Sequence, residues 1–397
     1  MTAEKYDIAV IGGGASGLMF AASLPLEGRK GILLEKTHSF GTKLLMSGGG
    51  RCNITHGGSI KDFISAYGES GPLLRKCLYR HSNLELADWL ADRGISLADE
   101  KGSLIEPHEI EDAGRLFPES MKASDILDML LAVSKENGWE LRTESEVFGL
   151  DHPDDEAGSW EIMTPGGCIA ADSIVIASGG ITFPETGSDG SVFGLLRDVG
   201  IEVTELRPAL APVYVEDYPY EDLSGVSLQD VTVTAFSSDA ACTCKGKAAR
   251  MRGDILFTHR GFSGPVILNI SGYAEPGEIL RLQYNRELSD LPKRMQKILE
   301  KRAAGPSGDV RTKVLAALLD HDDFRVISTD EKGMVTAGGI SLEEIDMTSM
   351  QIRNLPGLYA IGEAIDAYGI TGGYNLQMCW STARTAAEAL SSDDAGC

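Results

Sequence analysis

The start of the chain has the clearest pattern of apolar and polar positions. Residues 6–11 form a short apolar run of β character, residues 12–14 are glycines, and residues 15–24 form an apolar segment that ends at Pro25. Residues 31–35 form a second short apolar run that ends in an acid. A strand, a tight turn, a helix and another strand in this order are typical of a βαβ unit. The pattern therefore predicts a parallel sheet.

Along the rest of the chain, the kind of predicted secondary structure changes twice. Up to about residue 200, helices are predicted over 82–94 and 124–138, and strands over 141–150, 160–164, 168–171 and 173–177. Short strands over 213–215, 231–236, 254–257 and 279–284 then indicate a small β-rich domain, followed by charged, helix-prone sequence over about 287–320. A strand over 357–361 and a helix that includes 382–390 then return to the pattern of strands and helices predicted for the first 200 residues. We therefore predict a cofactor domain of residues 1–198 and 331–397, split by an inserted domain over 199–330.

Charge and cysteine content narrow the class of protein. The 36 Lys and Arg against 59 Asp and Glu give a net charge of −23, which repels a phosphate backbone, so we expect no nucleic acid partner. The seven cysteines show no CxxC pair and no regular spacing, which favours the reducing cytoplasm. The apolar segment 8–26 contains four glycines, and we interpret it as part of the βαβ unit rather than as a signal peptide or a membrane span. A cytoplasmic protein without a membrane partner is expected, and its oligomeric state stays open.

A GxGxxG motif lies between the first strand and the first helix. Gly12 permits the tight turn, Gly14 lets the backbone approach a pyrophosphate, and Gly17 lets helix and strand pack closely. The phosphates are expected at the amides of the helix N-terminus. Glu35 follows Gly17 by 18 residues, about where an acid that binds a ribose belongs. The motif predicts dinucleotide binding but does not distinguish FAD from NAD.

A second glycine-rich segment, residues 43–55, favours FAD. Its three consecutive glycines allow the chain to lie flat against a bulky planar ligand, and their amides form a concavity that binds anions. Arg51 offers a planar fork to phosphate. Asn53 and Thr55 carry groups that hydrogen-bond a ring edge or a ribityl chain.

Three later segments end a predicted strand or begin the last helix with small residues. The strand over 173–177 leads into Ser178 and Gly179, and the strand over 357–361 leads into Gly362 and Glu363, an acid suited to a ribityl hydroxyl. Residues 371–377 open the last helix, whose N-terminus would stabilise negative charge on a reduced flavin. Each segment alone is also explained as an ordinary strand end or helix start. Their order along the chain favours one shared cofactor site.

In these motifs the chain resembles the BaiN-type family of NAD(P)/FAD-dependent oxidoreductases, also called aminoacetone-oxidase-like flavoproteins. The resemblance runs nearly end to end and rests on DIAVIGGGASGL, KLLMSGGGRCNIT, GRLFPES, LFTHRGFSGP, GLYAIGEAID and TGGYNLQ. It implies an α/β fold, with a split FAD-binding Rossmann-like domain of the two-dinucleotide-binding type, an inserted small β-barrel-like domain and a helical sub-insertion. The implied FAD contacts are Gly12, Gly14, Ala15, Ser16, Gly17, Glu35, Lys36, Lys43, Gly49, Gly50, Arg51, Cys52, Asn53, Val147, Ser178, Gly179, Gly362, Glu363, Gly373, Asn375 and Gln377.

Four residues are candidates to act on a substrate. His259 and Arg260 lie in a loop of the inserted domain and are candidates to donate a proton and to hold an anionic group, unless the loop only fastens the insertion. Tyr374 and Tyr368 are candidate proton donors, with packing as the alternative role. Cys52 is interpreted as a small apolar residue beside the ring rather than as a redox group. No metal site is predicted, because the histidines lack the spacing of metal ligands.

We expect an FAD-dependent oxidoreductase that acts on a small molecule. In the first interpretation, NAD(P)H binds transiently and reduces the flavin, which then reduces an unsaturated or carbonyl-containing organic substrate. The alternatives are an oxidase of a small amine or amino ketone that produces peroxide, and a non-catalytic FAD-binding redox module. RNA modification is disfavoured by the net charge of −23. The substrate and the preference for NADH or NADPH stay open.

Overall fold

A computed structural model describes residues 3–151, 158–236, 247–303, 317 and 320–392. They form two compact units, which are described separately. Unit 1 comprises Met1–Arg207 and Thr336–Cys397, and unit 2 comprises Pro208–Val335. The chain passes between the units through β10 (Arg207–Ala209) and β17 (Val335–Ala337), which pair as a two-stranded sheet. The unit boundaries therefore lie at 207/208 and 335/336. The sequence pattern placed them at 198/199 and 330/331.

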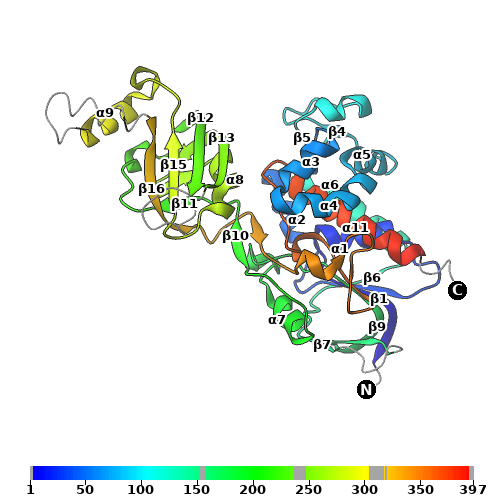
Figure 1. Ribbon diagram of the computed structural model, residues 1–397. Coiled ribbons are helices and arrows are strands. Elements are labelled where there is room, and N and C mark those ends of the chain that lie inside the picture. The colour runs from blue at the N-terminus through cyan, green and yellow to red at the C-terminus, as the bar shows by residue number, and fades with distance from the viewer. Residues whose placement is uncertain (1–2, 152–157, 237–246, 304–316, 318–319, 393–397) are drawn as a thin grey trace. The chain divides into compact units, whose positions relative to one another are not determined.

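Unit 1 is built on a nine-stranded sheet (Figure 1). The strand order is β18-β19-β20-β9-β1-β2-β6, and β8 pairs with both β9 and β7. The strands β20, β9, β1, β2 and β6 pair in parallel, and β1 and β2 carry buried Ile, Val and Leu side chains, as expected where both faces are covered. The bounds are β1 Glu4–Ile11, β2 Gly31–Leu34, β6 Glu140–Arg142, β7 Gly149–Asp151, β8 Trp160–Thr164, β9 Gly167–Ile176, β18 Ile345–Asp346, β19 Gln351–Ile352 and β20 Leu358–Ala360.

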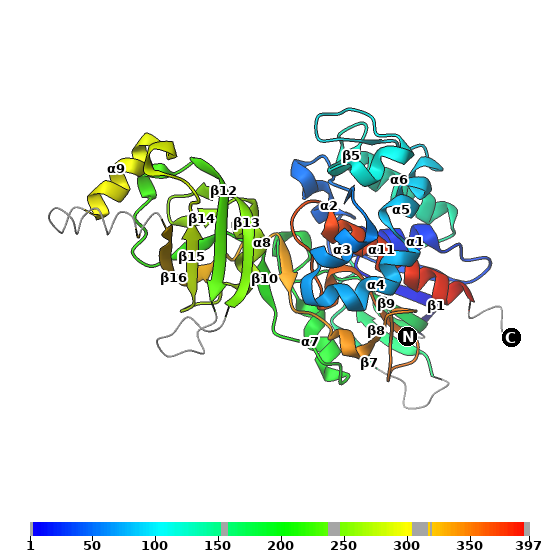
Figure 2. The ribbon, with the colours of Figure 1, turned by 45° about the horizontal axis from the view of Figure 1, so that its top comes forward.

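Helices and a small second sheet cover this framework. Helix α1 packs against both α6 and α11, and α4 packs against both α3 and α11 (Figures 1 and 2). A three-stranded sheet in the order β3-β5-β4 accompanies them. The bounds are α1 Ala15–Ser23, α2 Thr42–Met46, α3 Ile60–Ala66, α4 Gly71–Arg80, α5 Asn83–Ala91, α6 Ala123–Glu136, α7 Ser191–Asp198, α11 Tyr374–Ser392, β3 Thr55–His56, β4 Leu97–Ala98 and β5 Arg115–Pro118.

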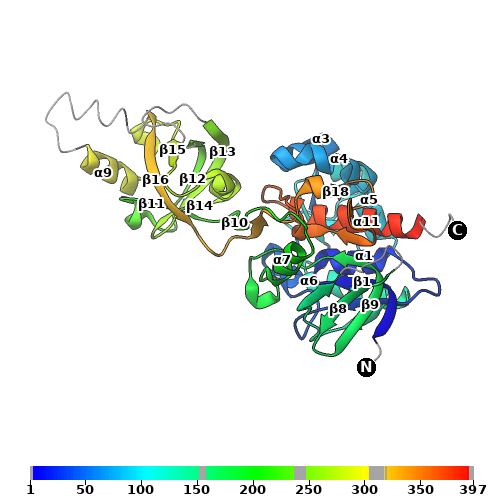
Figure 3. The same ribbon diagram turned by 60° about the horizontal axis from the view of Figure 1, so that its bottom comes forward.

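Unit 2 is a closed barrel with the strand order β11-β14-β13-β12-β15-β16 (Figure 3). Its neighbouring strands pair antiparallel, and closure leaves the sheet without an exposed edge. A separate apolar core fills it, with contributions from two helices. The bounds are β11 Val213–Val215, β12 Ser227–Phe236, β13 Lys247–Phe257, β14 Gly261–Ser263, β15 Ile279–Gln283, β16 Asp322–Thr329, α8 Pro265–Ile270 and α9 Lys293–Arg302.

The predicted fold class is confirmed, and the differences are local. The single strand predicted over 141–150 is wrong, because β6 and β7 are separated by a turn in which Glu144 has a positive φ of 52°. The two strands predicted over 168–177 are one continuous strand, β9. Of the predicted helical piece over 287–320, α9 is described, whereas residues 304–316 and 318–319 lie outside the described part.

Candidate functional site

The candidate motifs of unit 1 gather at the carboxyl ends of four adjacent parallel strands. In the order β20, β9, β1 and β2, these ends lead into Gly362, Ser178, Gly12 and Glu35. This edge is where open α/β sheets bind their ligands. Segments far apart in the sequence therefore meet at one place because of the strand order.

The turn between β1 and α1 leaves open space at the helix N-terminus. Gly12 has a φ of 112°, and a Cβ on it would collide with the carbonyl of Ala177. A Cβ on Gly17 would collide with the carbonyl of Gly12, so this turn and the helix are tightly packed. A Cβ on Gly14, by contrast, would meet no atom within 4 Å. Helix α1 begins at Ala15 with no side-chain cap and no acid in its first turn, which suits a pyrophosphate.

Glu35 follows β2 and is buried, with 8% of its surface exposed. One carboxylate oxygen accepts a hydrogen bond from the Gly13 amide at 2.9 Å, and the other accepts from the amide and hydroxyl of Thr37 at 2.7 and 2.8 Å. A carboxylate has about four acceptor positions, so one remains for a ribose hydroxyl.

The ammonium of Lys36 is paired with two carboxylates and is not free to bind a phosphate group. Its ammonium lies 2.6 Å from a carboxylate oxygen of Asp189 and 2.7 Å from one of Glu146. Burial lowers the pKa of Lys36, but the hydrogen bonds to these two carboxylates outweigh it and raise the pKa overall. The charge is thus already compensated, so only the backbone and the alkyl stem remain for a cofactor. The adjoining Val147 is buried and apolar.

The loop that contains Gly49 and Gly50 follows α2, and both glycines have left-handed backbones with φ of 68° and 85°. Arg51 closes this loop, because its Nε donates to the Gly48 carbonyl at 3.2 Å and its guanidinium lies 4.6 Å from the centre of the Phe117 ring. The side chain that was expected to bind phosphate therefore contacts the loop, β5 and the Glu100 carbonyl, to which it donates at 3.4 Å.

Cys52 and Asn53 connect this loop to the start of α11. Cys52 is fully buried, which raises the pKa of its thiol to about 12 although a hydrogen bond with Ser47 opposes the shift. With its amide oriented to satisfy both ends, Asn53 accepts from the Gly373 amide at 3.0 Å and donates to the Thr55 carbonyl at 3.1 Å. The loop and the helix N-terminus therefore form one site.

The amides of Asn375 and Gln377 brace the start of α11. Asn375 accepts from the Gly369 amide at 2.8 Å and donates to the Gly369 carbonyl at 3.0 Å. Gln377 accepts from the Thr55 hydroxyl at 2.6 Å and donates to the His81 carbonyl at 3.1 Å. Both side chains are occupied by protein partners, so a ligand at this position would meet the backbone.

Tyr374, the first residue of α11, stacks on His56 with ring centres 5.0 Å apart and an interplanar angle of 16°. Burial, and then the charge of Asp62, raises the pKa of Tyr374. His56 Nδ1 lies 2.8 Å from the Gly57 carbonyl oxygen, and since a carbonyl only accepts, Nδ1 is the donor in this contact. The sequence pattern did not single out His56 for this site, although it directly follows the loop of residues 43–55.

Glu363 is the centre of a polar cluster. Its carboxylate lies 2.7 Å from the Lys43 ammonium and accepts from the Thr336 amide at 2.8 Å and the Thr182 hydroxyl at 3.3 Å. The two threonines were missed, because no local pattern links positions so far apart in the sequence. The preceding Gly362 lies against the Ser16 hydroxyl of α1, where a Cβ would collide.

Two buried hydroxyls near the end of β9 have no partner among the described residues. They are the Oγ atoms of Ser178 and Ser188. A Cβ on Gly179, whose φ is 72°, would lie 2.9 Å from the Ser188 hydroxyl. Buried polar groups are nearly always hydrogen-bonded, so two unpaired hydroxyls here fit a polar ligand. With the space beside Gly14 and the remaining acceptor of Glu35, the residues fit FAD.

The other two catalytic candidates belong to unit 2. His259 and Arg260 are exposed in the loop between β13 and β14. The Arg260 guanidinium lies 5.1 Å from the centre of the Tyr214 ring, and the backbone amide of Arg260 donates to the Thr258 hydroxyl at 3.4 Å. His259 and Arg260 therefore belong to unit 2, whereas all the predicted FAD contacts belong to unit 1.

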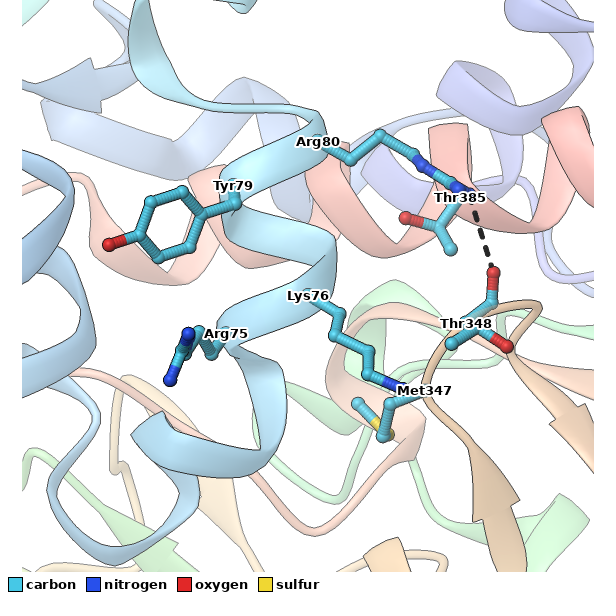
Figure 4. Close-up of a pocket in the computed structure, with 7 residues that line it drawn as sticks. All are labelled: Arg75, Lys76, Tyr79, Arg80, Met347, Thr348 and Thr385. Carbon is cyan, nitrogen blue, oxygen red and sulfur yellow. Dashed lines mark hydrogen bonds between the residues drawn. The ribbon is translucent and has the colours of Figure 1, made fainter.

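A separate open pocket of 520 Å³ lies between α4, α11 and the turn before β19 (Figure 4). Arg75 lies 5.7 Å from the centre of the Tyr79 ring, and Arg80 donates to the Thr348 carbonyl at 3.4 Å. Arg80 also lies 3.5 Å from Glu388. None of the predicted FAD contacts lines this pocket.

The described residues contain neither a membrane-spanning helix nor a cluster of metal-ligating side chains. No helix in the part of the chain that the structure describes has the length and apolar character needed to cross a membrane. No group of three or more His, Cys, Asp and Glu side chains within the same residues has the arrangement of a metal site.

Solved structures of low sequence identity share the fold. A flavocytochrome c3 fumarate reductase is similar at a TM-score of 0.51 and 16% identity, over 98% of this chain and 78% of that one. A 3-ketosteroid-Δ4-(5α)-dehydrogenase from Rhodococcus jostii RHA1 has a TM-score of 0.51 and 14% identity, over 97% of both chains.

Sequence comparisons identify the family. This chain is 30% identical to the ribosomal RNA dihydrouridine synthase of Escherichia coli K12 over 98% of both chains. It is 26% identical to the 3-dehydro-bile acid Δ(4,6)-reductase of Clostridium scindens over 96% of this chain and 98% of that one. The sequence profile of the HI0933-like protein Rossmann domain matches residues 6–389. The chain therefore belongs to the HI0933-like family of FAD-dependent oxidoreductases.

Proposed function

We propose that this protein is an FAD-dependent reductase of a carbon–carbon double bond conjugated to a carbonyl group. The observation that carries the proposal is that the reactions named for two relatives of this chain share the same chemistry. Making dihydrouridine saturates the uracil double bond that is conjugated to a ring carbonyl, and a Δ(4,6)-reductase of a 3-dehydro-bile acid saturates double bonds conjugated to the 3-keto group. FAD supplies hydride transfer in such reactions, and NAD(P)H is the proposed reductant.

The residues of unit 1 have separate roles in this proposal. The N-terminus of α1 beside Gly14 would bind the pyrophosphate, and Glu35 would bind a ribose hydroxyl. Glu363, held by Lys43, would accept a hydrogen bond from the ribityl chain. The N-terminus of α11 at Gly373 would stabilise negative charge at the ring edge.

Saturation of the double bond also needs a proton, and Tyr374 is the proposed donor. Its phenol is protonated at neutral pH, because the ordinary pKa of tyrosine is about 10 and burial raises the pKa of Tyr374 further. Tyr374→Phe keeps the ring that stacks on His56, so FAD content and reduction by NAD(P)H should stay unchanged. Transfer to the acceptor should slow by about 100-fold or more, measured by stopped-flow absorbance. His259→Gln and Tyr368→Phe are the matched variants for the other two candidate donors, and wild-type transfer in Tyr374→Phe would shift the role to whichever of these variants slows transfer.

Two substrate classes fit the proposed reaction. The first is a small conjugated ketone, which agrees with the small-molecule substrate expected from the sequence. The second is a uridine within RNA. The observation that favours the second is the higher identity, 30% against 26%, to the relative named for ribosomal RNA.

Mass spectrometry of the acceptor tests both classes. Holoprotein is incubated anaerobically with NADPH and either a 3-oxo-4-ene steroid or a uridine-containing RNA. The proposal expects one acceptor to gain the mass of two hydrogens, whereas gain by neither would contradict it. Peroxide release with a small amine instead would support the oxidase, and no turnover with either donor would support the redox module.

A further inference from the structure

The charge of this protein is distributed unevenly between its two units. Residues 208–335 contain 16 Lys and Arg against 18 Asp and Glu, a net charge of −2, so the rest of the chain carries −21 of the total of −23. The expectation of no nucleic acid partner came from the total charge. Unit 1 is strongly acidic and would repel a phosphate backbone, whereas unit 2 is close to neutral and would not.

Within unit 2, helix α9 concentrates positive charge. Its ten residues, Lys293–Arg302, include five cations and one acid, Glu300. Met295 and Leu299 are buried in the barrel core, which fixes the helix to unit 2. Arg302 pairs with the buried Asp322 at 2.5 Å and so serves the fold. The cationic face of α9, which we define as Lys293, Arg294, Lys297 and Lys301, is exposed.

The positive charges of this face destabilise helix α9 in two ways. Lys293, Lys297 and Lys301 are spaced four residues apart, so like charges are neighbours on the helix surface. Lys293 and Arg294 occupy the first turn, which has no acid, although positive charge is unfavourable at a helix N-terminus. Among the described residues, none of the four cations has an ion-pair partner or a hydrogen-bonded side chain. Such local conflicts are expected where a surface serves binding.

We propose that the cationic face of α9 binds the phosphate backbone of RNA. The proposal rests on the RNA form of the proposed function for the choice of partner, and the charge of the face is complementary to phosphate. An anionic membrane is disfavoured, because the apolar side of α9 is already packed against the barrel and an interfacial helix needs that side for lipid.

Fluorescence anisotropy of a labelled single-stranded oligouridine, titrated with holoprotein at several KCl concentrations, tests this surface. The wild type is expected to bind with a Kd of about 10 μM or tighter at low salt. Replacing three phosphate contacts by neutral residues should reduce the slope of log K against log salt by about 2. The binding variant combines Lys293→Gln, Lys297→Gln and Lys301→Gln.

The matched control changes the net charge by the same amount in unit 1, at three exposed lysines outside the predicted site. It combines Lys61→Gln, Lys101→Gln and Lys135→Gln. Equal losses in the two variants, or no RNA binding by the wild type, would overturn the proposal. Binding to phosphatidylserine vesicles through α9 in place of RNA would overturn it as well.

Two further readouts separate folding and turnover from binding. The α9 variant should have an unchanged or slightly higher Tm, because it removes like-charge repulsion and an unfavourable dipole interaction. RNA binding through α9 without any dihydrouridine would support the surface and contradict the RNA form of the reaction.

Discussion

At the scale of single residues, the glycines of the β1–α1 turn separate two requirements. Gly12 is required by the fold, because its φ of 112° and the nearby carbonyl of Ala177 exclude a side chain. Gly14 has a φ of −84°, which any residue adopts, and open space where a Cβ would lie. The fold alone therefore does not explain a glycine at position 14, whereas a closely bound pyrophosphate does.

This difference predicts opposite behaviour for two alanine substitutions. Gly12→Ala should lower the free energy of unfolding of the apoprotein by at least about 1–3 kcal/mol, the cost of the strained backbone. Gly14→Ala should change it by less than about 0.5 kcal/mol but should lower FAD occupancy, because the methyl group fills the space at the helix N-terminus. Urea unfolding and the ratio of flavin to protein absorbance measure the two effects. Full FAD occupancy in Gly14→Ala would remove the pyrophosphate from this turn.

Cys52 shows how burial determines chemistry at one position. With a pKa of about 12, its thiol is protonated at neutral pH and lacks the thiolate needed for nucleophilic or redox reaction. Iodoacetamide at about pH 8 should therefore leave Cys52 unmodified in the folded protein and label it after denaturation. The partly exposed Cys168 is the internal control, and peptide mass spectrometry reports both sites. Labelling of Cys52 at the rate of Cys168 would contradict its assignment as a buried apolar residue.

At the scale of elements, the junction of α4 and α5 contains a buried, neutral histidine. Burial, and then the charges of Arg384 and Arg80, lowers the pKa of His81 to about 3, although Glu388 lies 3.4 Å from its Nε2. The unfolded chain takes up this proton near the ordinary pKa of about 6.5, whereas the folded protein does not. Stability is therefore present above pH 6.5 and is lost as the pH falls toward 3.

The contribution of His81 predicts a pH dependence that a variant removes. By pH 5 the loss should be about 2 kcal/mol in the free energy of unfolding. In His81→Leu, the decrease in Tm between pH 7 and pH 5 should be smaller than in the wild type. Scanning calorimetry at both pH values checks this, and an identical decrease in the two proteins would show that His81 is not the group responsible.

The elements themselves were largely predictable from local pattern. The βαβ unit, the helices near 82–94 and 124–138 and the switch to short strands all arise from the period of apolar residues. Helix α5 follows its cap, since the Ser82 hydroxyl accepts from the Glu85 amide at 3.3 Å. The break between β6 and β7 was not predictable, because it is fixed by distant contacts. There the amides of Glu144 and Ser145 donate to the carbonyls of Thr37 and Glu35, each at 2.9 Å.

At the scale of the whole molecule, glycine motifs located the site, but the partners of its polar side chains depend on tertiary structure. The sequence placed Gly12, Glu35 and Glu363 at strand ends that the sheet order then brings together. It did not reveal that Thr336, at the far end of the insertion, caps Glu363 through its amide at 2.8 Å. The division of charge between the units likewise became visible only with the unit boundaries.

The central claim, an FAD-dependent reductase, is tested most directly by an anaerobic absorbance scan of the purified holoprotein before and after addition of NADH or NADPH. An FAD-dependent reductase should lose the oxidised flavin band near ~450 nm with one of the two nucleotides. The band should return when a conjugated carbonyl acceptor is added without oxygen. A band that persists with both nucleotides would contradict the reductase, and a protein that shows no flavin band even after incubation with FAD would contradict the cofactor site itself.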